Sequence, residues 1–148
     1  MKRTILLVGF VFGVVVGWVG VSDAEPTFIG AAKCKMCHKL QHDSWLETKH
    51  AKATESAKNA NDMKFEAACL GCHATNADEA LTGVQCEACH GPGSDYKSIQ
   101  VMKDRAKAVA NGLVIPTQAT CNRCHDGKEH RKAVKFDVTV VHAHKKKT

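Results

Sequence analysis

Hydrophobic residues are spread unevenly along the chain. One uncharged apolar stretch covers residues 5–21, and no later stretch approaches its length. After it, an alanine-rich composition favours a helix over residues 44–61. Ser44 is a candidate N-cap for that helix, and Glu47, three residues later, is its capping-box partner. The pattern therefore indicates short amphipathic helices rather than one long buried element.

A second helix is expected over residues 98–111, ended by Gly112. Its residues expected to face inward are Val101, Met102 and Val109. Alternation typical of strands is confined to residues 113–115 and 136–141. The fold class predicted is mainly α with extensive irregular chain.

The N-terminus has the layout of a secretory signal peptide. Lys2 and Arg3 precede the apolar stretch, and Ser22-Asp23-Ala24 supplies small residues before a possible cleavage at Glu25. A retained membrane anchor is the alternative, because the apolar stretch is close to the length that spans a bilayer. We expect residues 1–24 to be the signal peptide and residues 25–148 to form one domain, secreted to the periplasm. An extracellular location is the alternative.

All eight cysteines fall into four Cys-x-x-Cys-His motifs. The motifs are Cys34-Lys35-Met36-Cys37-His38, Cys69-Leu70-Gly71-Cys72-His73, Cys86-Glu87-Ala88-Cys89-His90 and Cys121-Asn122-Arg123-Cys124-His125. This signature is typical of c-type haem attachment: the two thiols bond one porphyrin, and the histidine ligates its iron. Zinc sites and thioredoxin-like motifs also use Cys-x-x-Cys, but neither needs a histidine directly after the second cysteine. The sequence predicts four covalently bound haem c groups.

Haems also change how composition and charge are interpreted. Only 5% of the residues are aromatic, so a chain of this length builds a modest core by itself, and the porphyrins must supply much of the interior. The formal charge is +6, signal cleavage removes one unit of it, and four haems of about −1 each leave the holoprotein near +1. This near-neutral charge argues against nucleic acid as a partner.

Nine histidines minus the four in the motifs leave five that could occupy the sixth iron position: His42, His50, His130, His142 and His144. A histidine on each face of the iron favours electron transfer over chemistry at the metal. The sequence indicates no catalytic residue. Met63 and Met102 are further candidate ligands, although core packing is the more common role of methionine.

Several blocks of the chain resemble the tetrahaem cytochrome c-554 family of ammonia-oxidising bacteria. They are the segment from Phe28 to His38, the segment from Gln41 to Ser56 around Trp45 and His50, the segment from Leu81 to Gly93 with its Gly-Pro-Gly turn, and Phe136-Asp137 followed by His142-Ala143-His144. The likeness covers nearly all of the chain after the signal. This chain is shorter than the family pattern around the second and fourth haems.

The resemblance implies a ligand set. It assigns His50 to the haem on His90, and it assigns His142, or alternatively His144, to the haem on His38. It also implies that the haem on His73 is five-coordinate, with an open face.

One departure concerns the haem on His125. The family has a histidine soon after Gly-Pro-Gly that caps the fourth haem, but Tyr96 occupies that region here. Tyrosine can ligate haem iron, although a packing role is expected. His130 or His42 could replace the missing ligand; otherwise the fourth haem is also open.

The function expected is that of a periplasmic electron carrier. The resemblance implies docking with a multihaem oxidase or a quinone-linked membrane cytochrome. If the signal is cleaved, we expect no stable insertion of this protein into the membrane. Two alternatives are open: reduction of a small nitrogen oxide such as nitric oxide at an open haem, and a subunit of an extracellular conducting filament. Such a filament would be a homo-oligomer, in which a neighbouring copy of the chain would supply the histidine ligands that one copy lacks.

Overall fold

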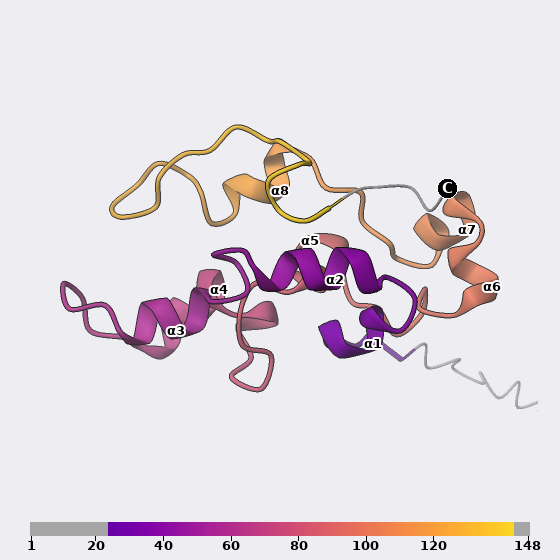
Figure 1. Ribbon diagram of the computed structural model, residues 1–148, viewed down its shortest axis with the longest axis horizontal. Helices are drawn as coiled ribbons and strands as arrows, with labels where there is room; N and C mark the ends of the chain where they lie inside the picture. The colour runs from indigo at the N-terminus through magenta and orange to yellow at the C-terminus, as the bar shows by residue number, and fades with distance from the viewer. Residues whose placement is uncertain (1–23, 144–148) are drawn as a thin grey trace, which may run out of the picture.

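A computed structural model describes residues 24–143 of the protein. Short helices follow one another along an elongated body, and the C-terminal segment after α8 runs back across it beside α2 (Figure 1). The helical elements are α1 (Ala31–Lys35), α2 (Lys39–Leu46), α3 (Ala53–Lys58), η1 (Ala67–Cys69), α4 (Leu70–His73), η2 (Thr75–Ala77), α5 (Cys86–His90), α6 (Ile99–Met102), α7 (Arg105–Ala110) and α8 (Gln118–Asn122). The predicted signal peptide, apart from Ala24, and His144 lie outside the described residues.

The predicted fold class, mainly α with much irregular chain, is confirmed. Within residues 24–143 there is no strand, and the only ladder contact is an isolated antiparallel bridge between Ala74 and Thr82. The strand signals at residues 113–115 and 136–141 therefore do not form strands. Over the same range, no helix has the length and apolar character that a membrane crossing needs.

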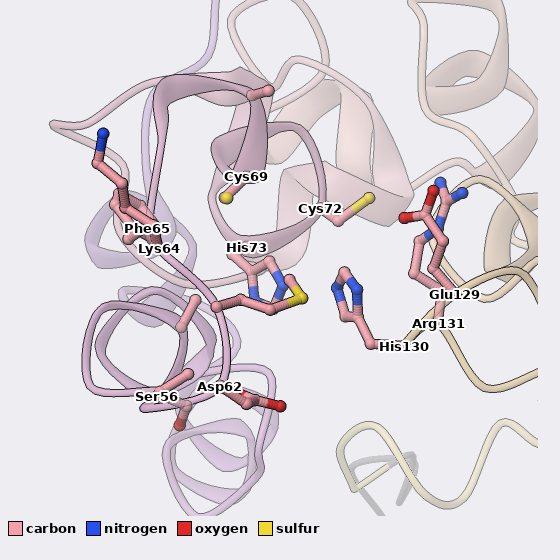
Figure 2. A pocket seen from close by; sticks show the side chains of 14 residues that line it. Ser56, Asp62, Lys64, Phe65, Cys69, Cys72, His73, Glu129, His130 and Arg131 are labelled. Atoms are coloured by element: carbon pink, nitrogen blue, oxygen red, sulfur yellow. The ribbon is translucent and has the colours of Figure 1, made fainter.

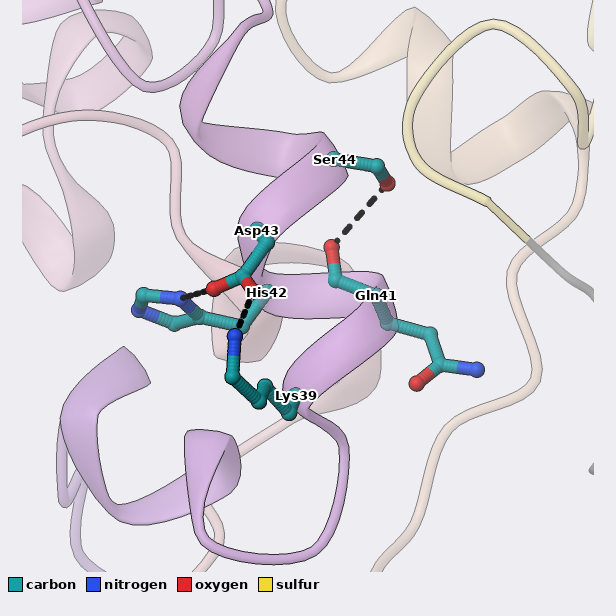
Figure 3. Close-up of polar contacts among 5 residues, drawn as sticks. All are labelled: Lys39, Gln41, His42, Asp43 and Ser44. Atoms are coloured by element: carbon teal, nitrogen blue, oxygen red, sulfur yellow. Dashed lines mark hydrogen bonds and ion pairs between the residues drawn. The ribbon is translucent and has the colours of Figure 1, made fainter.

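The helix expected over residues 44–61 is divided into α2 and α3. Ser44 lies inside α2 rather than at an N-cap, and its hydroxyl donates to the carbonyl of Gln41, 3.2 Å away (Figure 3). Thr48 ends α2, since its backbone N–H and its hydroxyl both donate to the carbonyl of Trp45, at 2.9 and 2.7 Å. The turn that follows carries His50.

The helix expected over residues 98–111 is also divided, because the sequence contains two N-caps. The Ser98 side chain caps α6, and the Asp104 side chain caps α7 by accepting from the N–H of Lys107 at 3.1 Å. Restarting at Asp104 rotates the buried face of the second helix. Ala108 is buried, whereas Val109, expected to face inward, is exposed.

The described residues contain few buried apolar side chains, namely Ala31, Trp45, Leu70, Ala74, Tyr96 and Ala108. The largest fully buried side chains, Glu87 and Thr75, are both polar. A core this small cannot offset the conformational entropy lost on folding 120 residues. The fold therefore depends on an apolar interior that the polypeptide does not supply.

Polar contacts instead hold the segments together. The Thr54 hydroxyl accepts from the N–H of Gly83 at 2.7 Å and donates to the carbonyl of His73. The Thr75 hydroxyl donates to the carbonyl of Gly83 at 2.9 Å and accepts from the N–H of Gln85 at 2.8 Å. The two threonines thereby join α3 and the second Cys-x-x-Cys-His motif to the strand-like segment that leads into the third.

Candidate haem-binding site

Each Cys-x-x-Cys-His motif lies at a short helix. The second and third motifs coincide with α4 and α5, the first begins in α1, and the fourth begins in α8. In the first and fourth motifs the histidine N–H donates to the carbonyl of the first cysteine, at 2.9 Å in both cases. One helical turn therefore places cysteine and histidine on the same side. None of the eight cysteines, all of which are among the described residues, forms a disulfide, so all eight are available for haem attachment.

The motifs adjoin one another in an order that differs from their order in the sequence. The first motif adjoins the third, since α1 contacts α5, and the neighbouring Cys86 together with burial raises the pKa of the Cys34 thiol. The guanidinium of Arg123 in the fourth motif donates to the carbonyl of Ala88 in the third. The Cys124 thiol of the fourth motif donates to the carbonyl of Gly71 in the second at 3.9 Å, and burial together with the neighbouring Cys72 raises its pKa to about 12. The spatial order is therefore first, third, fourth, second.

Three of the motif histidines face a histidine from elsewhere in the chain. The ring centroids are 6.1 Å apart for His125 and His50, 6.3 Å for His73 and His130, and 6.3 Å for His90 and His142. Each pair joins one motif histidine to one histidine outside the motifs. Such a consistent pattern indicates that the pairs serve one purpose.

The distances fit a haem iron between the two rings of each pair. A bond between a metal and an imidazole nitrogen is about 2.0–2.1 Å long, and the ring centroid lies about 1.2 Å further on, so two axial imidazoles have centroids about 6.4 Å apart. The observed separations match this span.

Hydrogen bonds orient the motif histidines for ligation. The Nδ1 atoms of His73, His90 and His125 lie 3.2, 3.1 and 3.1 Å from the carbonyls of Ala53, Val114 and Lys132 respectively. A carbonyl can only accept, so Nδ1 carries the proton, and Nε2 carries the lone pair that can bind a metal. This is the arrangement that metal-binding histidines use.

His50 is held in its neutral form. Burial, and secondarily the neighbouring His125, lower the pKa of the His50 imidazole below its usual value. Neutral imidazole is the metal-binding form. The backbone at this position is also fixed, because the carbonyl of His50 accepts from the N–H of Val84 at 2.8 Å.

The pairing differs from the one that the resemblance implied. His50 faces His125 rather than His90, and His142 faces His90 rather than His38. The reason is the fold: the segment after α8 runs back beside α2 (Figure 1), where the N–H of Ala143 donates to the Ser44 hydroxyl at 2.6 Å. Spacing along the sequence does not encode this proximity. The fourth motif, for which His130 or His42 was the candidate partner, faces His50 instead.

The remaining candidates have other surroundings. His38 is exposed, and within residues 24–143 its ring faces no other histidine. His42 is buried on α2, with its ring 5.7 Å from that of Trp45 and its Nδ1 3.4 Å from a carboxylate oxygen of Asp43 (Figure 3). His42 thus packs within its own helix.

Tyr96 has the packing role that its position suggested. Its hydroxyl donates to the carbonyls of Gly91 and His90, at 2.7 and 3.2 Å. Burial raises the pKa of the phenol, so it stays protonated at ordinary pH. Tyr96 therefore fixes the backbone at His90 and Gly91 through its hydroxyl.

Glu87 is a site residue that sequence reasoning missed. It occupies a variable position of the third motif, is 2% exposed, and accepts from the backbone N–H groups of Ile29, Gly30 and Gly93, with the shortest bonds at 2.7 Å. The carboxylate fastens the third motif to the segment that enters the first. Its place between Cys86 and Cys89 hid this role, because those two positions of the motif accept most residues.

Four attachment motifs, with facing histidines on a mainly helical chain, define a multihaem c-type cytochrome. Residues 33–91 match the family model described as cytochrome c554 and c-prime. The chain is similar to cytochrome c-554 of Nitrosomonas europaea, with 36% identity over 138 residues, covering 69% of this chain and 59% of that relative. The chain thus spans less than two thirds of the length of this curated relative.

The solved structure of reduced cytochrome c554 from Nitrosomonas europaea is also similar. Its TM-score is 0.57 at 30% identity, and the match covers 74% of this chain and 70% of that one. The protein belongs to the cytochrome c-554 family. The predicted cofactor, four covalently bound haem c groups, is confirmed with it.

Proposed function

We propose that this protein is an electron carrier that passes electrons among its four haems and between redox partners. The observation that carries the proposal is the adjacency of the four motifs, described above through Cys34 and Cys86, Arg123 and Ala88, and Cys124 and Cys72. Each thiol would bond the edge of one porphyrin, so adjacent thiols bring the edges of successive haems together. Haem supplies a one-electron iron couple whose potential the axial ligands and burial set.

The histidine pairs favour electron transfer over substrate chemistry. In this proposal His50 is the distal ligand of the haem on His125, and His142 is the distal ligand of the haem on His90. Both irons then have filled coordination spheres, which leaves no position for a substrate. His144 remains the predicted distal ligand of the haem on His38.

The periplasm is the proposed location, since the N-terminal segment has the layout of a signal peptide and c-type haem is attached outside the cytoplasm. A multihaem oxidase or a quinone-linked membrane cytochrome is the proposed class of partner. The near-neutral charge expected of the holoprotein suits short-lived complexes, which need modest interfaces rather than strong attraction.

Protein-film voltammetry on the mature holoprotein tests the function. We expect reversible exchange of four electrons per chain, because all four haems are connected through the path of motifs. Adding nitric oxide should leave the current unchanged. A catalytic current on that addition, in protein with four haems per chain, would replace the electron carrier with the enzymatic alternative.

A further inference from the structure

The strongest unassigned feature lies between the second motif and the loop after the fourth. A cavity of about 430 Å³ opens there, lined by Cys69, Cys72 and His73 on one side and by His130 and Arg131 on the other. His73 and His130 both point into it, with the Cys72 thiol beside them (Figure 2). The cavity therefore contains every group that the second haem is bound through.

The loop that carries His130 is tightly built. The N–H of Gly127 donates to the carbonyl of Arg131 at 2.9 Å, and the N–H of Arg131 donates to the carbonyl of Lys128 at 2.9 Å. A salt bridge of 3.3 Å between Arg131 and Asp126 closes the loop, and both side chains are mostly shielded from solvent. These contacts on both sides of His130 fix the position of its backbone.

Backbone strain next to His130 points to the same conclusion. Glu129 has a φ of 51°, the left-handed conformation that a side chain with a Cβ rarely adopts. This conformation is strained for a residue other than glycine. It turns the chain so that the next residue faces His73. Strain of this kind persists where the surrounding structure fixes a functional geometry.

The ring geometry at this pair is the most regular of the three. His73 and His130 are inclined by only 18°, against 58° for His50 and His125 and 46° for His90 and His142. The ring centroids of His73 and His130 are 6.3 Å apart, close to the separation of about 6.4 Å expected for two imidazoles that bind one metal ion. They are spaced for one metal ion between them, as the two other pairs are.

A buried donor also fits a haem in this cavity. The Nε atom of Arg131 is shielded from solvent and has no hydrogen-bond partner among the described residues. An unsatisfied buried donor of this kind costs free energy. A haem carries two propionates, and a carboxylate is the group that a guanidinium binds best. Arg131 is therefore placed to receive an anionic group of the cofactor.

We propose that His130 is the sixth ligand of the haem on His73, which closes the face that the resemblance left open. The proposal deepens the proposed function, and it requires that the protein carries haem on Cys69 and Cys72. With both axial positions filled, this haem exchanges electrons and does not bind small gases. The assignment also means that one segment, His125 to His130, ligates two neighbouring haems.

The test compares His130→Ala with the wild type and with Lys128→Ala, a control in an exposed position of the same loop. Each protein is matured with its haems and reduced, and carbon monoxide is titrated to count the haems that bind it. We expect His130→Ala to bind one more equivalent per chain than the wild type. Lys128→Ala should match the wild type. The oxidised His130→Ala protein should gain one high-spin haem in its EPR spectrum.

Covalent attachment keeps the comparison interpretable, because the second haem stays bonded to two thioethers when a distal ligand is lost. His130→Met is a second variant: it retains a ligand, so it should bind no extra carbon monoxide, and it should raise one midpoint potential. Equal carbon monoxide stoichiometry in His130→Ala and the wild type, with four haems in each, would overturn the assignment. The electron-carrier function would survive that result, since it is tested by voltammetry on the wild type.

Discussion

At the scale of single residues, the buried carboxylate of Glu87 joins two segments that lie far apart in the sequence. It accepts from the backbone N–H groups of Ile29 and Gly30, which precede α1, and from that of Gly93, which follows α5. A carboxylate is suited to this place because it accepts at both oxygens and donates nothing. An amide of the same size is not, because its NH₂ group would face N–H donors.

We expect Glu87→Gln to lower the free energy of unfolding by about 1–3 kcal/mol, the cost of leaving buried polar groups without partners. Guanidinium unfolding of the mature holoprotein, followed by the haem absorption band, measures the change. Glu79→Gln, at an exposed position, is the matched control and should unfold like the wild type. Equal midpoints for the two variants would show that Glu87 contributes no more than a surface carboxylate.

The attachment residues could be predicted from the sequence, whereas the distal ligands could not be assigned to their haems. Attachment requires two thiols and an imidazole within five consecutive residues, so the chemistry is written locally. A distal ligand needs only to lie on the opposite face of the haem. It comes from 52 to 75 residues away, as the pairs of His50, His130 and His142 with their motif partners show. The fold determines which distal histidine lies opposite which motif histidine, and no local sequence pattern indicates that pairing.

At the scale of elements, the sequence predicted helical regions correctly but joined what the structure divides. Alanine content made residues 44–61 favourable for one helix, yet Thr48 ends α2 through its contacts to Trp45. The break matters, because the turn it creates presents His50. Propensity is a weak local preference, and here tertiary contacts override it.

Gly83 supports that turn from the other side. Its φ is +76°, and a Cβ built on it would lie 2.5 Å from the carbonyl oxygen of Ala51. Its N–H and carbonyl are used by Thr54 and Thr75, and Val84 next to it holds the carbonyl of His50. A side chain at this position would therefore push the segment away from His50.

We expect Gly83→Ala to lower the free energy of unfolding by roughly 2 kcal/mol or more, from the left-handed backbone and the close contact together. The control is Gly71→Ala in α4, where a Cβ would meet nothing within 4 Å. Because alanine is the better helix former, this control should equal or exceed the wild type in stability. Thermal unfolding of both holoproteins measures the difference. If Gly83→Ala were as stable as Gly71→Ala, the segment would be shown to shift without cost.

At the scale of the whole molecule, the scarcity of buried apolar side chains links folding to the cofactor. The buried apolar residues are few, and the largest buried groups are Glu87 and Thr75. Their hydrogen bonds specify which segments meet, but hydrogen bonds add little net free energy by themselves. The apolar surface of the porphyrins is then the main driving force for compaction.

We expect the chain to be unfolded when it is produced without haem. Far-UV circular dichroism should show little helix, and heating should give no cooperative transition. The mature protein, measured under the same conditions, should show both helix and a cooperative transition. A cooperative transition in the haem-free chain would contradict this expectation, because it would reveal a core that the polypeptide forms alone.

The spatial order of the motifs, first, third, fourth, second, has a consequence for truncated chains. The fourth motif, near the C-terminal end of the sequence, lies between the third and the second in space through Arg123 and Cys124. Proteolytic loss of the C-terminal quarter of the sequence would therefore remove a haem from within the row of four haems, and not the haem at its end. The haems of the first and third motifs would stay adjacent, but the haem of the second motif would be separated from them. Such a sample would retain three of its four haems and yet could no longer pass electrons along the whole molecule.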